Sequence, residues 1–450
     1  MKTLRLYGAG LLVALLLTLA AHGSSSPNFT LSLNPTSLTV QQGSSGTTQL
    51  TITPQGGFTG TVNLSLVGAP SGVTLSPTSL NVRGTRPVTQ SLTVRVAGGV
   101  ATGTYNLQVR ATSGRLTKTA NLRLTVSAPG GGGAGTTWTL RNLGDTSFEG
   151  VAYGNGLFVA VGDVATILTS PDGVNWTPQI LGTGYGLNDV TYGNGLFVAV
   201  GEGPTIFTSR DGVTWTRRTP GTDYWLYGVT YGNGLFVAVG GYSSLESSDS
   251  VILTSPDGAT WTPRTSGTSN RLFGVTYGNG LFVAVGDGGT ILTSPDGVTW
   301  TARTSPTRGW LNDVTYGNGL FVAVGRGGRI LTSSDGVNWT ARTAETSDDL
   351  YGVTYGNGPF VAVGDRGAIL TSPDWVAWTL RDPGTGNDLY GVTYGNGLFV
   401  AVGFNTILTS PDGAAWTART SPTSNPLMGV AYGNNTFVAV GSSDTILTSP

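Results

Sequence analysis

Short runs in which polar and apolar residues alternate fill residues 27–127. Examples are FTLSLNP, GTVNLSLVG and ANLRLTVS, and Pro, Gly or Asn separates one run from the next. Alternation with a period of two places every second side chain on the same face of a strand, so each run predicts a strand buried on one side. About seven such runs within roughly 100 residues predict a sandwich of two antiparallel sheets.

From residue 137 onward the pattern changes to a passage of about 39 residues that occurs eight times. The clearest copy begins at Leu272 and runs LFGVTYGNGLFVAVGDGGTILTSPDGVTWTARTSPT. A repeat of this length, rich in β-branched and aromatic residues and interrupted by Gly, predicts a radially closed array of sheets. The Tyr of its YGN element marks the copies, at Tyr153, Tyr192, Tyr231, Tyr277, Tyr316, Tyr355, Tyr394 and Tyr432.

Turn residues divide each repeat into four extended runs. In the Leu272 copy these runs are 273–277, 281–285, 290–294 and 299–303. Asn-Gly and Asp-Gly supply the positive φ angles that tight hairpins need, which favours four antiparallel strands joined in order. We therefore predict an all-β chain in which residues 137–450 form an eight-bladed β-propeller.

The two ends of the repeat region complement each other. Trp138 lies in an isolated fourth-strand sequence before the first complete repeat, and the chain ends at Pro450 just after a third strand. Pairing of these N- and C-terminal strands would complete the last blade and leave no exposed sheet edge, so we expect it to close the ring. The alternative is that further repeats follow Pro450.

Residues 1–23 have the pattern of a secretory signal peptide. Lys2 and Arg5 precede an apolar run, Leu11–Ala20, that is too short to span a bilayer, and small residues follow it. We expect a bacterial protein that is secreted or held at the cell surface, a monomer with no membrane span once the signal is removed; an uncleaved anchor is the alternative. A Gly-rich linker at 128–136 is expected to separate the sandwich at 27–127 from the repeats.

Composition excludes several kinds of chemistry. The chain has no Cys, and its single His, His22, lies in the predicted signal. The mature chain would therefore lack Ser–His and Cys–His nucleophiles and His- or Cys-ligated metal sites, so we expect no cofactor and no metal. Loss of Lys2 and Arg5 changes the net charge from −1 to −3. This charge gives no electrostatic reason to expect binding to nucleic acid.

The run from Ser294 to Trp300, SPDGVTW, resembles the Asp-box, the bacterial neuraminidase repeat found between the third and fourth strands of several propeller families. This sequence departs from the Asp-box pattern in two ways. The spacing between Asp and Trp is one residue shorter than usual, and Trp375 stands where Gly is expected. A carboxylate in such a hairpin accepts backbone N–H bonds and fixes the turn, so the resemblance implies a structural role. The recurring Asp residues are Asp172, Asp211, Asp257, Asp296, Asp335, Asp374 and Asp412.

The N-terminal segment resembles bacterial immunoglobulin-like domains. The matching sequences include Gly57–Gly60 (GFTG) and Gly103–Tyr105 (GTY), and the resemblance covers the whole of 27–127. It implies a spacer or a surface attachment, with carbohydrate binding as the alternative.

Two sets of turns are expected on opposite faces of the ring. The YGNG and SPDG turns are nearly constant, whereas the loops at the other end of each strand vary between copies. Loops on a rigid scaffold commonly carry recognition, so we place a ligand site on the variable face near the central channel. Aromatic rings beside carboxylates suit the apolar faces and hydroxyl edges of sugars. The candidate residues are Tyr224, Trp225, Trp310, Asp189, Asp313, Tyr351 and Tyr390.

Our expectation for function is a non-enzymatic binding or adhesion module with a glycan or protein ligand and no catalytic residues. A glycoside hydrolase, sialidase-like or of another Asp-box type, is the first alternative; Asp189 and Asp313 would be its acid–base pair. Their positions, three repeats apart, argue against this pairing. Sialidases also need several converging Arg residues, whereas most Arg residues here recur at one repeat position. A structural envelope protein is the second alternative.

Overall fold

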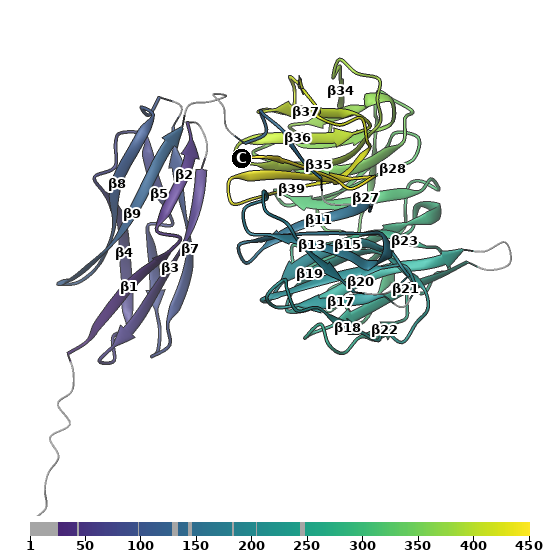
Figure 1. Ribbon diagram of the computed structural model, residues 1–450. Helices are drawn as coiled ribbons and strands as arrows, with labels where there is room; N and C mark the ends of the chain where they lie inside the picture. Colours follow the sequence, from purple (N-terminus) through teal and green to yellow (C-terminus); the bar gives the residue numbers. More distant parts are fainter. Residues whose placement is uncertain are drawn as a thin grey trace, which may run out of the picture. The chain divides into compact units, whose positions relative to one another are not determined.

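The computed structural model describes residues 26–42, 45–97, 99–127, 134–142, 146–181, 184–203, 205–243 and 248–450. The expected signal peptide at 1–23 and most of the expected linker, 128–133, lie outside the described residues. The described chain forms two compact units, one within 26–40 and 46–126 and one from 127 onward (Figure 1). In the described ranges, no helix combines the length and apolar character that a bilayer crossing requires.

The first unit contains two antiparallel sheets. One sheet has the order β1-β3-β7-β5 and the other has the order β2-β9-β8-β4-β6. Alternate residues of these strands, such as Leu50 and Ile52 of β3, are fully buried between the sheets. The strands are β1 Asn28–Asn34, β2 Ser37–Gln41, β3 Ser45–Gln55, β4 Gly60–Val67, β5 Val73–Ser76, β6 Ser79–Val82, β7 Val88–Val96, β8 Gly103–Ser113 and β9 Leu116–Ser127.

The sequence pattern missed two of these nine described strands, β2 and β6. Both are short, and both lie at an edge of the five-stranded sheet. Each also follows the preceding strand after only two residues, at Pro35-Thr36 and Pro77-Thr78. A prediction of seven strands was wrong here because alternation over four or five residues next to Pro resembles the end of the preceding strand.

In the second unit, each repeat folds into a four-stranded antiparallel sheet whose strands follow chain order. Seven such sheets begin at β11, β15, β19, β23, β27, β31 and β35, and an eighth has the order β10-β41-β40-β39. Their first and second strands are β11 Phe148–Gly154, β12 Leu157–Gly162, β15 Leu187–Gly193, β16 Leu196–Gly201, β19 Trp225–Gly232, β20 Leu235–Ser243, β23 Leu272–Gly278, β24 Leu281–Gly286, β27 Leu311–Gly317, β28 Leu320–Gly325, β31 Leu350–Tyr355, β32 Phe360–Gly364, β35 Leu389–Gly395, β36 Leu398–Gly403, β39 Leu427–Gly433 and β40 Thr436–Gly441.

The fourth strands are the shortest of each sheet and are largely exposed. Short 3-10 turns, η1 Asp163–Ala165, η2 Asp287–Gly289 and η3 Asp365–Gly367, precede three of the third strands. The third and fourth strands are β13 Thr166–Ser170, β14 Thr177–Ile180, β17 Ile206–Ser209, β18 Thr216–Arg218, β21 Ser248–Ser255, β22 Thr262–Arg264, β25 Ile291–Ser294, β26 Thr301–Ala302, β29 Arg329–Ser333, β30 Thr340–Arg342, β33 Ile369–Ser372, β34 Thr379–Arg381, β37 Thr406–Ser410, β38 Thr417–Arg419, β41 Thr445–Ser449 and β10 Thr139–Asn142.

The sheets of the second unit are arranged radially. The first strand of each sheet contacts the first strand of the next, and β39 of the last sheet contacts β11 of the first. Figure 1 shows β39 and β11 side by side. The cycle of contacts places all the first strands at the centre, so the arrangement is propeller-like.

Burial on both faces explains the uninterrupted apolar run LFVAVG in the second strands. Phe282 and Ala284 pack in one cluster with Val237 of the preceding sheet, whereas Val283 packs in another with Phe321 of the following sheet. All five of these side chains are fully buried. Each buried Phe or Val contributes roughly 1.5–3 kcal/mol, and the repeats supply this contribution at every junction between sheets.

The two ends of the described second unit are joined by strand pairing. β10 pairs antiparallel with β41, with Thr139 opposite Thr448 and Leu140 opposite Leu447. The backbone N–H of Gly135 donates to Oγ of Ser449, at 2.7 Å. This is the pairing that the isolated strand next to Trp138 predicted.

Candidate functional site

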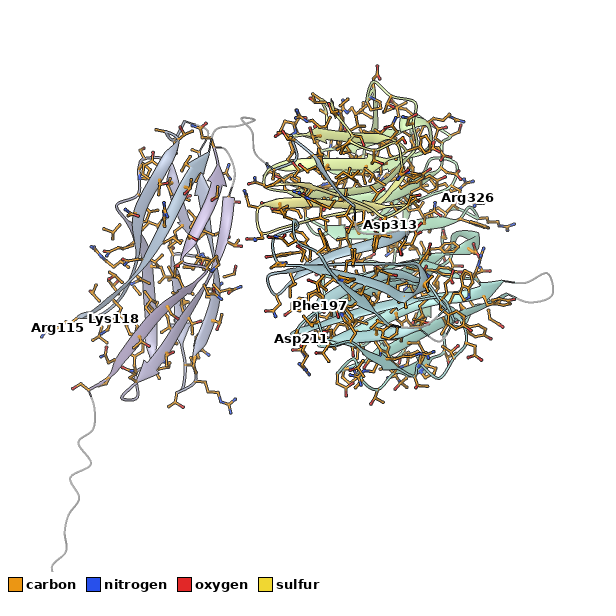
Figure 2. All side chains as sticks on the ribbon, in the orientation of Figure 1. Arg115, Lys118, Phe197, Asp211, Asp313 and Arg326 are labelled. Carbon is orange, nitrogen blue, oxygen red and sulfur yellow. The ribbon has the colours of Figure 1, made fainter. Side chains whose placement is uncertain are left out.

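The antiparallel order of the strands places two kinds of loop at opposite ends. The YGNG and SPDG hairpins join strands one to two and three to four, and the variable loops make the other connections. Figure 2 shows Asp211 of an SPDG-type hairpin and Arg326 of a variable loop on opposite sides of the second unit, with Asp313 between them. We name the end that carries Arg326 the variable face.

The SPDG hairpins are held together by their Asp carboxylates. Oδ1 of Asp335 accepts the backbone N–H groups of Val337 and Asn338, both at 2.8 Å, and the hydroxyl of Ser333. These bonds favour the ionised carboxylate and lower its pKa, the bond from Asn338 most. Each of the seven recurring Asp residues has the same pattern of partners.

The fourth-strand Trp completes this hairpin. Nε1 of Trp339 donates to the backbone oxygen of Gly336, at 2.9 Å, and six other Trp residues make the equivalent bond. Trp375 occupies the Gly position in one sheet, with a φ of 65°. Nε1 of Trp378 there is buried without an acceptor. The carboxylates of these hairpins are therefore engaged in turns, at the end opposite the variable face.

Four aromatic side chains form a row across three neighbouring sheets on the variable face. The ring centroids of Trp225 and Tyr227 are 6.4 Å apart, those of Tyr227 and Phe273 are 5.6 Å apart, and those of Phe273 and Trp310 are 5.9 Å apart. Each ring is partly or largely accessible, and Trp225 is 39% exposed. We name Trp225, Tyr227, Phe273 and Trp310 the aromatic row.

Guanidinium groups lie along the Phe273–Trp310 part of the aromatic row. The guanidinium of Arg326 lies 3.5 Å from the ring centroid of Trp310, and that of Arg271 lies 5.3 Å from it. Arg271 pairs with Asp287 at 2.8 Å, and this bond raises the pKa of Arg271. Stacking on a ring face orients a guanidinium and leaves its N–H groups at the edge able to donate.

Asp189 and Asp313 occupy equivalent positions on the innermost strands. Oδ1 of Asp189 accepts the N–H of Val190 at 2.8 Å, and Oδ2 accepts the N–H of Val229 in the next sheet at 2.9 Å. Asp313 makes the same two bonds, to Val314 and Val353. Both carboxyls therefore join neighbouring sheets.

Burial dominates the ionisation of these two carboxyls, although each keeps some access to solvent along the centre of the ring. Burial raises the pKa of Asp189 to about 7, and the charge of Asp313 adds a smaller increase. Burial raises the pKa of Asp313 as well. The structure thus places two carboxyls with raised pKa values at equivalent positions of the innermost strands.

The other candidate residues fall into separate groups. The hydroxyl of Tyr351 donates to Oδ1 of Asp365 at 2.6 Å, and its ring centroid lies 5.8 Å from that of Tyr390. The hydroxyl of Tyr224 donates to Oδ2 of Asp249 at 3.0 Å, which raises the pKa of Tyr224. Trp225 and Trp310 are thus the candidates that the structure brings into one aromatic row.

Sequence reasoning left Tyr227, Phe273, Arg271 and Arg326 out of the candidate set. Tyr227 and Phe273 occupy one repeat position, at which Glu149 and Met428 stand in the first and last copies. The signal that marks them is the aromatic residue at the same position of consecutive repeats, because consecutive first strands are neighbours. The sequence gives no sign that Arg271 and Arg326 meet at the ring of Trp310, since they come from different kinds of loop.

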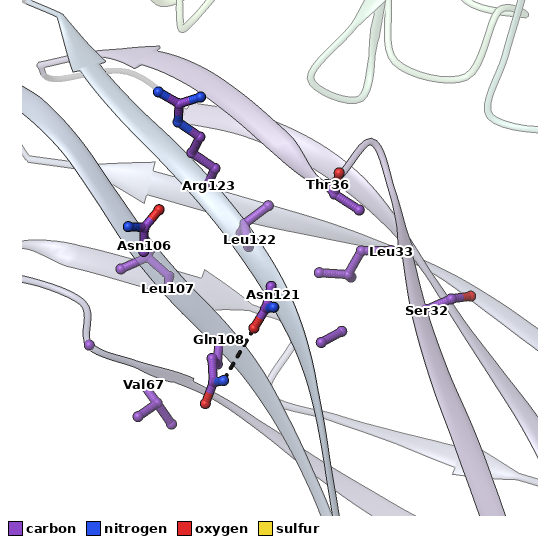
Figure 3. Close-up of a pocket in the computed structure, with 12 residues that line it drawn as sticks. Ser32, Leu33, Thr36, Val67, Asn106, Leu107, Gln108, Asn121, Leu122 and Arg123 are labelled. Carbon is purple, nitrogen blue, oxygen red and sulfur yellow. Dashed lines mark hydrogen bonds between the residues drawn. The ribbon is translucent and has the colours of Figure 1, made fainter.

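The first unit has a surface groove with a volume of about 730 Å³. Figure 3 shows Leu33, Leu107 and Leu122 along it, with the amide of Gln108 donating to Asn121 at 3.2 Å. Arg123 is the one titratable residue among those that line it. A groove with one cation and no carboxylate lacks the groups for acid–base chemistry.

Comparison with known proteins gives the fold alone. No family model and no curated protein matches the chain. BamB from Moraxella catarrhalis is similar over 69% of this chain and 97% of its own, with a TM-score of 0.50 and 10% sequence identity. A quinonprotein alcohol dehydrogenase-like protein from Bacteroides thetaiotaomicron covers 92% of this chain and 96% of its own, with a TM-score of 0.36 and 11% identity. The likeness to BamB agrees with a propeller-like all-β fold.

Proposed function

We propose that the protein is a secreted or cell-surface binding module of a bacterium, without enzymatic activity, that recognises a glycan on its variable face. In this proposal residues 137–450 are an eight-bladed propeller with Asp-box hairpins, and residues 27–127 are an immunoglobulin-like spacer. The spacer would hold the propeller away from the surface to which the chain is attached.

The aromatic row carries the proposal. Sugar rings have apolar C–H faces that pack on aromatic rings, and four adjacent rings offer such contacts over several sugar units. Polar side chains close to the row, such as Arg326 and Asp349, supply partners for hydroxyl groups. The row therefore fits an extended glycan chain better than a single small ligand.

A glycoside hydrolase is the second candidate, because burial raises the pKa of Asp189 to about 7. A raised pKa is what a general acid requires. However, both oxygens of each carboxyl accept backbone N–H bonds, so neither has an oxygen free of a protein partner. The binding function is favoured for this reason.

A glycan array tests the binding function with the full chain. We expect selective binding to a small set of glycans, and a loss of about tenfold or more in affinity in Trp225→Ala, since burial of one aromatic ring accounts for a change of this size. Tyr185→Ala is the matched control, because Tyr185 is 45% exposed and lies in a variable loop outside the row.

Two results would count against the proposal. Equal losses in Trp225→Ala and Tyr185→Ala would remove the aromatic row as the site. Release of reducing sugar from a bound glycan, abolished in Asp189→Asn, would favour the hydrolase instead.

A further inference from the structure

Four Arg residues gather around one variable loop, Arg308-Gly309-Trp310. Arg326 and Arg271 approach the ring of Trp310 as described above. Arg329 packs against Gly309 so closely that a Cβ there would lie 2.3 Å from its Nε. Arg308 is exposed at the start of the loop. We name Arg271, Arg308, Arg326 and Arg329 the arginine cluster.

The arginine cluster has more positive charge than its carboxylate partners neutralise. Asp287 pairs with Arg271 at 2.8 Å, and Asp349 lies 3.6 Å from Arg326, beyond hydrogen-bond distance. Among the described residues no carboxylate comes within ion-pair distance of Arg308 or Arg329. The cluster thus keeps an excess of two positive charges in a chain whose net charge is −1.

The repeat itself shows that this charge is local to two neighbouring sheets, those that begin at β23 and β27. Arg326 follows the VG that ends the second strand, and four other copies have an acidic residue there, at Asp163, Glu202, Asp287 and Asp365. By contrast, the regularly repeated Arg residues donate to a third-strand Thr in their own sheet, as Arg303 does to Thr293 at 2.7 Å. The arginine cluster has no such repeated structural role.

We propose that the arginine cluster and the aromatic row together bind a polysaccharide that carries carboxylate groups on its sugar rings. This inference rests on the glycan-binding function proposed above and specifies its ligand class. The guanidinium of Arg326 lies over the ring of Trp310, and a planar guanidinium matches a carboxylate with two parallel N–H donors. Arg308 provides a second cationic contact at the exposed edge of the loop.

The aromatic row and the arginine cluster are expected to contact different parts of the polysaccharide. Phe273 and Tyr227 continue from Trp310 along neighbouring sheets and offer ring faces to consecutive sugars. The cluster lies at the Phe273–Trp310 end, where a carboxylate would replace Asp349, 3.6 Å away, as the partner of Arg326. A neutral polymer would retain the aromatic contacts and the hydrogen bonds to its hydroxyl groups, and it would lose the charge-assisted bonds to the guanidinium groups.

Binding of the full chain to three carboxylated polymers tests the inference. Polygalacturonate, alginate and hyaluronan are each compared with their carboxyl-reduced counterparts, which keep the linkage and lose the charge. We expect at least one acidic polymer to bind about tenfold or more tightly than its reduced form, with affinity falling as salt increases. Arg308→Ala/Arg326→Ala should remove this preference.

Two further variants test whether binding depends on the arginine cluster rather than on exposed Arg residues in general. Arg217→Ala removes an exposed Arg from the outer strand β18 and should leave binding unchanged. Arg326→Asp introduces the residue type of the equivalent positions in other copies, so it should fold normally and weaken binding to the acidic polymer by about tenfold or more.

Equal affinity for acidic and reduced polymers would overturn the inference and leave the glycan-binding function standing. The inference would also fail if none of the three acidic polymers bound while neutral glycans bound on the array. Absence of binding to every polymer and every array glycan would overturn both the inference and the proposed function.

Discussion

The backbone N–H of Val353 donates to Oδ2 of Asp313 across neighbouring sheets, at 2.9 Å. Asp189 and Val229 form the same link at 2.9 Å, between the sheets that begin at β15 and β19. The equivalent position is Gly in the other six copies, at Gly150, Gly228, Gly274, Gly352, Gly391 and Gly429. Two of the eight junctions between sheets thus contain a carboxyl that the remaining junctions lack.

These two carboxyls predict a fall in stability as pH rises through the neutral range. Their pKa values are raised in the folded chain, to about 7 for Asp189, so the folded state binds protons that the unfolded state has released above about pH 4. Each group therefore stabilises the fold fully below about pH 4, and this contribution is lost as pH rises through the folded pKa, which is about 7 for Asp189, by at most about 1.4 kcal/mol per pH unit.

Chemical unfolding between pH 4.5 and 8 measures this effect. Asp189→Asn should flatten the dependence, because the amide does not titrate. A dependence on pH that is identical in the wild type and Asp189→Asn would show that Asp189 is ionised throughout.

The SPDG hairpins act in the opposite direction at low pH. Their Asp carboxyls have lowered pKa values, about 2 for Asp211, so their stabilisation is present above about pH 4 and is lost as pH falls through the folded pKa. Asp335→Ala should lower the free energy of unfolding by about 1–2 kcal/mol at pH 5, as the loss of a helix N-cap does. Asn338→Ala, which removes one of the four bonds to Asp335, should cost less. Equal losses of unfolding free energy in Asp335→Ala and Asn338→Ala would contradict the claim that the carboxylate holds the hairpin together.

Trp375→Gly is expected to stabilise the chain by about 1 kcal/mol. The substitution relieves a φ of 65° at a non-Gly residue and removes a buried Nε1 that has no acceptor. It also allows Nε1 of Trp378 to bond the backbone oxygen of residue 375, as in the other sheets. These gains oppose the loss of the packing of Trp375 against its core cluster.

Thermal unfolding measures the outcome, with Gly336→Trp as the matched control in the neighbouring sheet. A Cβ at Gly336 would lie 2.4 Å from Leu281, so that variant should be destabilised. If Trp375→Gly were destabilised as well, packing of Trp375 would outweigh the hairpin geometry.

Thr139→Cys/Thr448→Cys is expected to join the two ends of the second unit through a disulfide. The two positions are direct partners in the β10–β41 pair, and the chain contains no other Cys. Closure of so long a loop should raise the free energy of unfolding by about 2–4 kcal/mol. Thiol titration and mobility on a non-reducing gel measure the bond, and free thiols under oxidising conditions would contradict strand pairing at this junction.

The four-stranded sheets of the second unit could be predicted from a few recurring residues of the repeat. Asn-Gly and Asp-Gly turns set the hairpins, and the isolated strand at Trp138 predicted the pairing with β41. The short edge strands β2 and β6 were not predicted, because alternation over four or five residues does not distinguish a strand from a loop. An all-β chain of many four-stranded sheets is confirmed; the blade count and the immunoglobulin-like assignment stay predictions.

The candidate site was less predictable because its members are brought together by neighbouring sheets. Tyr227, Phe273 and Trp310 lie in three repeats, and their ring contacts depend on the register at which the first strands pack. Arg326 reaches Trp310 from the second-to-third-strand loop of its sheet, whereas Trp310 lies before the first strand. The periodicity within one repeat does not predict the distances between rings of neighbouring sheets, and it does not predict the distance from Arg326 to Trp310.

Hydrogen–deuterium exchange of the full chain, with and without the polysaccharide that binds most tightly, tests the central claim that recognition takes place on the variable face. We predict that ligand slows exchange in 225–227, 271–273 and 308–310, and leaves the SPDG hairpins, such as 333–339, unchanged. Slower exchange confined to those hairpins, or to the groove residues 106–108 and 121–123 of the first unit, would contradict the claim.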